Sequence, residues 1–83
     1  MRAVTAPQMR AIDAAAVARD QATALIRAIG QLPLEQRDAF LLQIEGDLSI
    51  EEVATVTRSS FETTKSRLRY ARNRLRELLS EYA

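Results

Sequence analysis

The sequence predicts an all-α domain of four helices, on the evidence of its composition and of the spacing of its apolar residues. Apolar residues make up 47% of an 83-residue chain that contains only two glycines and two prolines. They recur at steps of three and four, which is the helical period. These observations favour one compact helical domain with a single small core over a disordered chain.

The first helix is expected to begin near Gln8. Residues 1–7 contain Pro7, show no apolar period and are predicted to be a disordered end or linker, so the folded domain is placed at residues 8–83. Gly30 is expected to end this long helix. Its apolar face is predicted to contain Ile12, Ala15, Ala16, Ala22, Leu25, Ile26 and Ile29.

A second helix of about three turns is expected between Pro33, which suits a first helical turn, and Gly46. Phe40, Leu41 and Ile44 share one face of it. Together with residues from the other helices, its apolar side is expected to form the core: Leu25, Ile29, Leu32, Phe40, Leu41, Val53, Leu68 and Leu75.

Two cap signals predict the last two helices. The segment 49–52 has the form of a capping box, in which Ser49 and Glu52 exchange hydrogen bonds at a helix start. Residues 57–59 interrupt that short helix, and Ser60 is expected to cap the fourth. The fourth helix carries the most regular stripe in the chain: Phe61, Thr64, Leu68, Ala71, Leu75, Leu78 and Tyr82.

Composition excludes several classes of function. The chain has no cysteine and no histidine, which removes the usual zinc sites and Ser-His or Cys-His catalysis. No apolar run approaches the roughly 20 residues that a membrane-spanning helix needs. We therefore expect a cytosolic protein that is not an enzyme and needs no cofactor or metal, with Glu51, Glu52 and Glu62 serving as helix caps and surface charge.

The net charge of +1 conceals a strong separation of charge. Residues 35–52 hold six acidic and one basic residue, a net of −5, whereas residues 58–76 hold seven basic and one acidic, a net of +6. A short helix, a turn and a longer basic helix form a helix-turn-helix pattern, which places its second helix in the DNA major groove. An ordinary helical hairpin with solvated arginines is the alternative.

A helical wheel places the basic residues of the fourth helix on two flanks. Lys65, Arg69, Arg72 and Arg76 lie on one flank, and Arg67 and Arg74 lie on the other. Cations at the flanks suit the two phosphate backbones of a groove, and short polar side chains between them suit the base edges. The residues between the flanks are Glu62, Thr63, Ser66, Tyr70 and Asn73.

Three sequence blocks then carry a resemblance: LPLEQRDAFLL (residues 32–42), LSIEEVA (48–54) and TTKSRLRYAR (63–72). Over about residues 22–79 the chain closely resembles region 4 of bacterial RNA polymerase sigma factors, especially the extracytoplasmic-function group. The resemblance implies a winged-helix-like, sigma region 4 fold that binds the promoter minus-35 element. It also implies docking on the polymerase β flap, and an anti-sigma factor as a possible partner.

Region 2 of that family has no counterpart, so the resemblance implies a region 4 fragment whose first twenty residues end an inter-region linker. The motif and the wheel together predict the DNA-binding residues. Arg67 is expected to meet either phosphate or an internal acidic partner such as Glu51, and Tyr70 either to read bases or to pack. The full set is Ser60, Glu62, Thr63, Lys65, Ser66, Arg67, Arg69, Tyr70, Arg72 and Asn73.

The chain departs from the family pattern around the turn. Arg58 and Glu62 stand where the family commonly has glycine, and Ser59 stands where it has a small apolar residue. Arg58 at positive φ would be strained, so we expect an altered turn or a compensating hydrogen bond. Gln43 stands where the family often has an arginine that touches the DNA backbone, so that contact is not carried over to this chain.

Two other functions remain open from the sequence. One is a protein-interaction module whose main partner is the flap or an anti-sigma factor. The other is an output domain of the response-regulator type, which dimerises through its last helix at Leu75, Leu78 and Leu79. The chain is expected to be a monomer.

Overall fold

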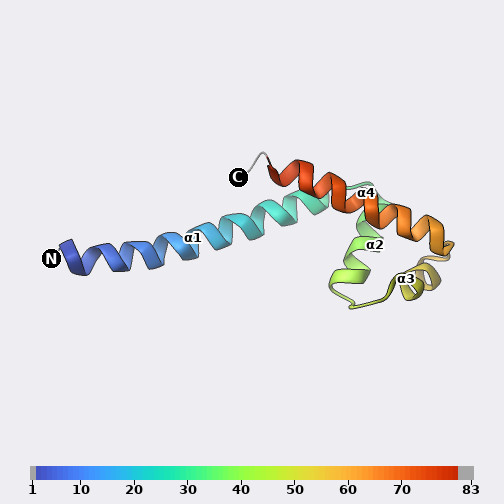
Figure 1. The fold of residues 1–83 in the computed structure, drawn as a ribbon, viewed down its shortest axis with the longest axis horizontal. Helices are drawn as coiled ribbons and strands as arrows, with labels where there is room; N and C mark the ends of the chain where they lie inside the picture. The colour runs from blue at the N-terminus through green and yellow to red at the C-terminus, as the bar shows by residue number, and fades with distance from the viewer. Residues whose placement is uncertain (1, 81–83) are drawn as a thin grey trace.

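The computed structural model describes the backbone of residues 2–80 and the side chains of residues 14–80. Its four helices are α1 (Arg2–Gly30), α2 (Leu34–Ile44), α3 (Ile50–Thr57) and α4 (Phe61–Ser80), as Figure 1 shows. The predicted fold class and the order of the four helices are confirmed. Ile12 and Tyr82, which we placed on apolar faces, lie outside the residues whose side chains are described.

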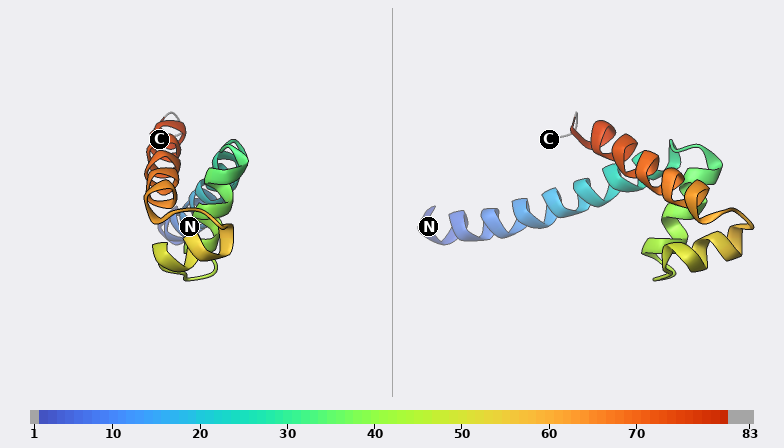
Figure 2. Two further views of the ribbon diagram at one scale, coloured as in Figure 1. Left: turned by 90° about the vertical axis from the view of Figure 1, so that its right-hand side faces the viewer. Right: turned by 45° about the vertical axis from the view of Figure 1, so that its right-hand side comes forward.

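The helix α1 begins at Arg2, whereas the sequence predicted a start near Gln8. Its helical backbone therefore includes residues 2–7, which were expected to form a disordered end or linker. Alanine has the highest helix propensity, and the five alanines among residues 11–18 favour the helix that follows Pro7. The N-terminal half of α1 projects beyond the other helices, and the longest extent of the molecule is 62 Å (Figures 1 and 2).

The helix α4 is the centre of the fold, because it packs against each of the other three helices. One buried cluster joins α1 to its C-terminal half and consists of Ala28, Leu32, Ala71 and Leu75. The other joins α2 and α3 to its N-terminal half and consists of Ala39, Val53 and Leu68. Phe40 packs against both clusters, so α2 links the two halves of the core.

Seven of the eight predicted core residues are at least partly buried. Leu32, Val53, Leu68 and Leu75 are buried, and Ile29, Phe40 and Leu41 are partly buried. Leu25 is the exception, since 39% of its surface is exposed. Its inclusion in the core was wrong, because its side chain stays exposed although it lies only three residues before the buried Ala28.

The end of α2 depends on Gly46. A Cβ atom at this position would lie 2.6 Å from the carbonyl oxygen of Leu42, which is too close for any side chain. The next residue, Asp47, has a φ of 54° and turns the chain toward α3. The predicted end of the second helix near Gly46 is thus explained by a close backbone approach.

The capping box at the start of α3 is confirmed. The backbone N–H of Glu52 donates to Ser49 Oγ at 3.1 Å, and the Ser49 N–H donates to Glu52 Oε1 at 2.9 Å. The bond from the Ser49 backbone, followed by that from its hydroxyl, lowers the pKa of Glu52 below its ordinary value of 4.5.

The lowered pKa of Glu52 predicts a small acid-dependent loss of stability. A depressed folded-state pKa contributes stability that is fully present above the unfolded pKa and is lost as pH falls through the folded value. We expect Glu52→Gln to flatten the decline of melting temperature below about pH 4.5, because the amide does not titrate. Circular dichroism melts between pH 3 and pH 7 measure this, and an unchanged acid limb would contradict it.

Arg58 adopts the left-handed conformation at the end of α3, with φ 54° and ψ 44°. Its N–H donates to the Thr55 carbonyl at 3.3 Å, and the Ser59 N–H donates to the Ala54 carbonyl at 3.0 Å. This pair of bonds is the Schellman pattern, whose left-handed position usually holds glycine. The predicted compensation of a strained Arg58 by local hydrogen bonds is confirmed.

Relief of this strain is expected to stabilise the domain. Arg58→Gly should raise the free energy of unfolding by about 1 kcal/mol, since a left-handed conformation costs other residues roughly 1–2 kcal/mol. Arg76→Gly is the matched control in the exposed part of a helix, where glycine should destabilise by about 1 kcal/mol. Urea unfolding measures both, and a destabilised Arg58→Gly variant would show that the arginine side chain matters more than its backbone.

Candidate nucleic-acid interface

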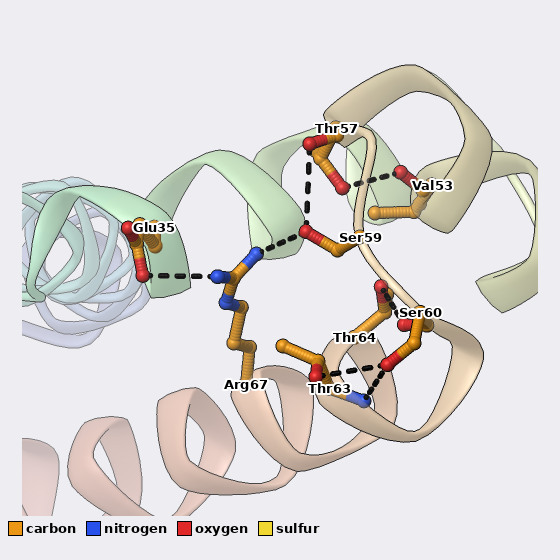
Figure 3. Close-up of polar contacts among 8 residues, drawn as sticks. All are labelled: Glu35, Val53, Thr57, Ser59, Ser60, Thr63, Thr64 and Arg67. Atoms are coloured by element: carbon orange, nitrogen blue, oxygen red, sulfur yellow. Dashed lines mark hydrogen bonds and ion pairs between the residues drawn. The ribbon is translucent and has the colours of Figure 1, made fainter.

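A cap network fixes the start of α4. The N–H of Thr63 donates to Ser60 Oγ at 3.1 Å, and that hydroxyl donates to Thr63 Oγ1 at 2.9 Å. The buried hydroxyl of Thr64 donates to the Ser60 carbonyl at 2.9 Å (Figure 3). The predicted cap at Ser60 is confirmed, and a hydrogen bond joins the hydroxyls of Ser60 and Thr63 at the start of the helix.

The two sides of α4 have different roles. Thr64, Leu68, Ala71 and Leu75 are buried against the other helices. The opposite side carries most of the predicted DNA-binding residues: Ser60, Glu62, Thr63, Lys65, Arg69, Tyr70, Arg72 and Asn73 are exposed, whereas Ser66 and Arg67 are partly buried. We call six residues of that side the outer face, namely Glu62, Lys65, Ser66, Arg69, Tyr70 and Asn73.

Tyr70 belongs to the outer face and is 55% exposed. The guanidinium carbon of Arg69 lies 5.5 Å from the centroid of its ring, a cation–π contact. The ring therefore supports the arginine side chain in an exposed position. Between packing in the core and facing outward, the structure places Tyr70 outward.

Several flanking arginines already have partners within the protein. Arg72 donates through Nη2 to Gln43 Oε1, which connects α4 to α2. Arg74 Nη1 lies 3.2 Å from Glu77 Oε2, and Arg76 donates to the Asn73 side chain at 3.4 Å. Exposed pairs of this kind are weak, so these cations remain available to exchange their partners for phosphate.

Arg67 differs from the other basic residues of α4. Its Nη2 atom lies 3.1 Å from Glu35 Oε2, its Nη1 atom donates to Ser59 Oγ at 2.6 Å, and only 25% of its side chain is exposed (Figure 3). An internal acidic partner was one of our two expectations. We named Glu51 for it, and the partner is Glu35, because the N-terminal end of α2 crosses α4 beside Arg67.

A groove lies beside this ion pair, between α2 and the end of α3. Its apolar lining comes from Leu41, Leu42 and Val56, and it also contains the acidic residues Glu35, Asp38 and Glu45. The remaining lining comes from Gly46, Thr57, Arg58, Ser59 and Arg67. Sequence reasoning missed this groove, although the acidic excess in residues 35–52 was the signal for it.

Other kinds of site find no support in the described part of the chain. No group of three or more histidine, cysteine, aspartate or glutamate residues there could hold a metal ion. No described helix is both long and apolar enough to cross a membrane.

Comparison with known proteins agrees with this geometry. A search of the curated proteins gave no match. The family model for sigma-70, region 4, matches residues 22–75. The match begins in the last third of α1 and includes α2, α3, the turn and most of α4. Because it spans well over half of the chain, the protein belongs to the sigma-70 region 4 family.

Proposed function

We propose that this chain binds the minus-35 element of a promoter, as region 4 of a sigma factor of the extracytoplasmic-function group. In this role α4 enters the major groove and directs RNA polymerase to the promoter. The protein acts in the cytosol, without enzymatic activity or a cofactor. Membership of the region 4 family supports promoter binding at the minus-35 element, and the exposed basic residues of α4 support contact with DNA.

The arrangement of charge on α4 carries this proposal. The major groove is about 12 Å wide, admits one helix and has a phosphate backbone on each side. Lys65 and Arg69 of the outer face are exposed together with Arg72 on one flank of α4, and Arg74 is exposed on the opposite flank. The polar side chains between them suit hydrogen bonds to base edges, while the cations suit the backbones.

The test is a fluorescence anisotropy titration with a minus-35 duplex and a scrambled duplex of the same composition. We expect tighter binding to the minus-35 duplex, with an affinity that falls steeply with salt. About five phosphate contacts would give a slope of about −4 to −5 in log K against log salt. Equal affinity for the two duplexes would contradict sequence-specific recognition.

The groove beside α2 supports a second binding function for the same domain. Its apolar and acidic lining differs from the basic outer face of α4, so it suits a protein partner. We propose the β flap of the polymerase, or an anti-sigma factor, as that partner. Simultaneous binding of the isolated flap and the minus-35 duplex is expected, and mutual exclusion would contradict separate sites.

The packing of the C-terminal leucines supports a monomer over a dimer of the response-regulator type. Such a dimer would need Leu75, Leu78 and Leu79 at its interface. Leu75 is only 5% exposed, and Leu78 and Leu79 pack against the cluster that includes Ala28 of α1. Sedimentation equilibrium is expected to give the monomer mass without DNA.

A further inference from the structure

We propose that Arg67 is a positioning residue, which ties α2 to the turn before α4 and so sets the orientation of the outer face without contacting DNA itself. This inference rests on the proposed function, because the orientation of α4 matters for recognition only if α4 reads DNA. We call Glu35, Ser59 and Arg67 together the Arg67 clamp.

The Arg67 clamp connects three parts of the fold. Arg67 belongs to α4, Glu35 lies in the first turn of α2, and Ser59 lies in the turn between α3 and α4. One guanidinium group bonds both partners, at 3.1 Å to Glu35 and 2.6 Å to Ser59 (Figure 3). Because its two terminal nitrogens contact different elements, the side chain fixes their positions relative to one another.

The chemistry of the clamp requires arginine. The planar guanidinium presents its donors in a rigid fork, whereas a lysine ammonium is a single point on a flexible chain. The bond to Ser59 is charge-assisted, because its donor is an ionised guanidinium. A lysine at this position keeps the positive charge but cannot bridge the two partners in the same geometry.

The turn between α3 and α4 is stabilised by the bond from Arg67 to Ser59. Arg58 is held in the left-handed conformation, and the Ser59 hydroxyl donates only a long bond of 3.4 Å to the Thr57 carbonyl. Ser59 directly precedes Ser60, the residue that caps α4. A fixed Ser59 therefore fixes the point from which α4 starts, and the hydroxyl can accept the arginine bond where a small apolar residue cannot.

Loss of the Arg67 clamp should change the free energy of unfolding only slightly. The reason is that 71% of the Glu35 side chain is exposed, and exposed ion pairs contribute little to stability. The effect on recognition comes from the population of the competent arrangement. If loss of the clamp lowers that population to between a third and a tenth, the affinity for the specific duplex falls about three- to tenfold.

The first experiment measures the affinity ratio between the minus-35 and scrambled duplexes for three variants, Arg67→Lys, Glu35→Ala and Ser59→Ala. We expect each to lower the ratio about three- to tenfold, with a salt slope close to that of the unmodified protein. Asp38→Ala is the matched control. It removes one exposed negative charge from the same helix and groove, outside both ion pairs among residues 14–80, and should leave the ratio unchanged.

The opposite interpretation, in which Arg67 contacts a phosphate, predicts different results. Arg67→Lys would then keep most of the affinity. Glu35→Ala would strengthen binding by releasing Arg67, and Arg67→Ala would reduce the salt slope by about 0.9. Any of these three results would overturn the clamp.

A second measurement tests the clamp without DNA. The amides of Arg58 and Ser59 donate the bonds that close the turn, so their hydrogen exchange, measured by NMR, should be faster in Arg67→Lys and Ser59→Ala. Unchanged exchange would overturn the clamp even if DNA recognition is real. Equal affinity of the unmodified protein for both duplexes would overturn the proposed function instead, and the exchange result would still decide whether the clamp exists.

Discussion

Alanine at Lys65 or at Arg69 is expected to weaken binding to a minus-35 duplex by about 1–3 kcal/mol, which is about 5- to 150-fold. Both side chains are exposed on the outer face of α4, on the side away from the buried stripe. Removal of either side chain leaves the core untouched, so the loss reports recognition rather than unfolding.

The two variants also separate base contacts from phosphate contacts. A lost base contact relaxes specificity at one position of the duplex, whereas a lost phosphate contact weakens all duplexes alike and reduces the salt slope by about 0.9. Arg19→Ala is the matched control, because it removes the same charge as Arg69→Ala from an exposed position on α1. If Lys65→Ala and Arg69→Ala bind as the control does, direct recognition by the outer face is wrong.

Leu68→Ala is expected to lower the free energy of unfolding by about 2–5 kcal/mol, the usual cost of truncating a buried leucine. Leu68 is 1% exposed and is among the largest fully buried side chains of the described residues. It packs with Ala39 and Val53 where α2, α3 and α4 meet, so its truncation leaves a cavity shared by three helices. The total free energy of unfolding of a small domain is only about 5–15 kcal/mol, so this loss is a large part of it.

Urea unfolding followed by circular dichroism measures this loss. Ile26→Ala is a suitable control, because Ile26 is 69% exposed on α1 and its truncation should change the free energy of unfolding by no more than about 0.5 kcal/mol. Equal losses in the two variants would show that the cluster around Leu68 is not the main source of stability. Since α4 is also the proposed DNA-binding helix, Leu68→Ala should lose DNA binding at temperatures where it unfolds.

Features encoded by neighbouring residues were predicted well from the sequence. The capping box of Ser49 and Glu52 depends on residues three apart, and so does the cap of α4 at Ser60. The strained conformation of Arg58 was predicted because the family commonly has glycine at that position. In each case the chemistry of a short segment determines the local structure, so the sequence of that segment is enough to predict it.

Features that depend on how helices cross were not predicted. Leu25 has the same helical spacing as true core residues, but its burial depends on how the other helices lie against α1. The ion pair of Arg67 with Glu35 and the bond between Arg72 and Gln43 join residues far apart in the chain. Which residues of α2 contact Arg67 and Arg72 depends on how α2 lies across α4, and no local sequence pattern predicts that arrangement.

The division of α4 into a buried stripe and an outer face has a practical consequence for engineering. The residues that hold the fold together, Thr64, Leu68, Ala71 and Leu75, are separate from the six that form the outer face. If the outer face reads DNA as proposed, exchanging its side chains should change promoter preference while the packing residues stay constant. Variants that share one fold but differ in the outer face could then each activate a different set of promoters.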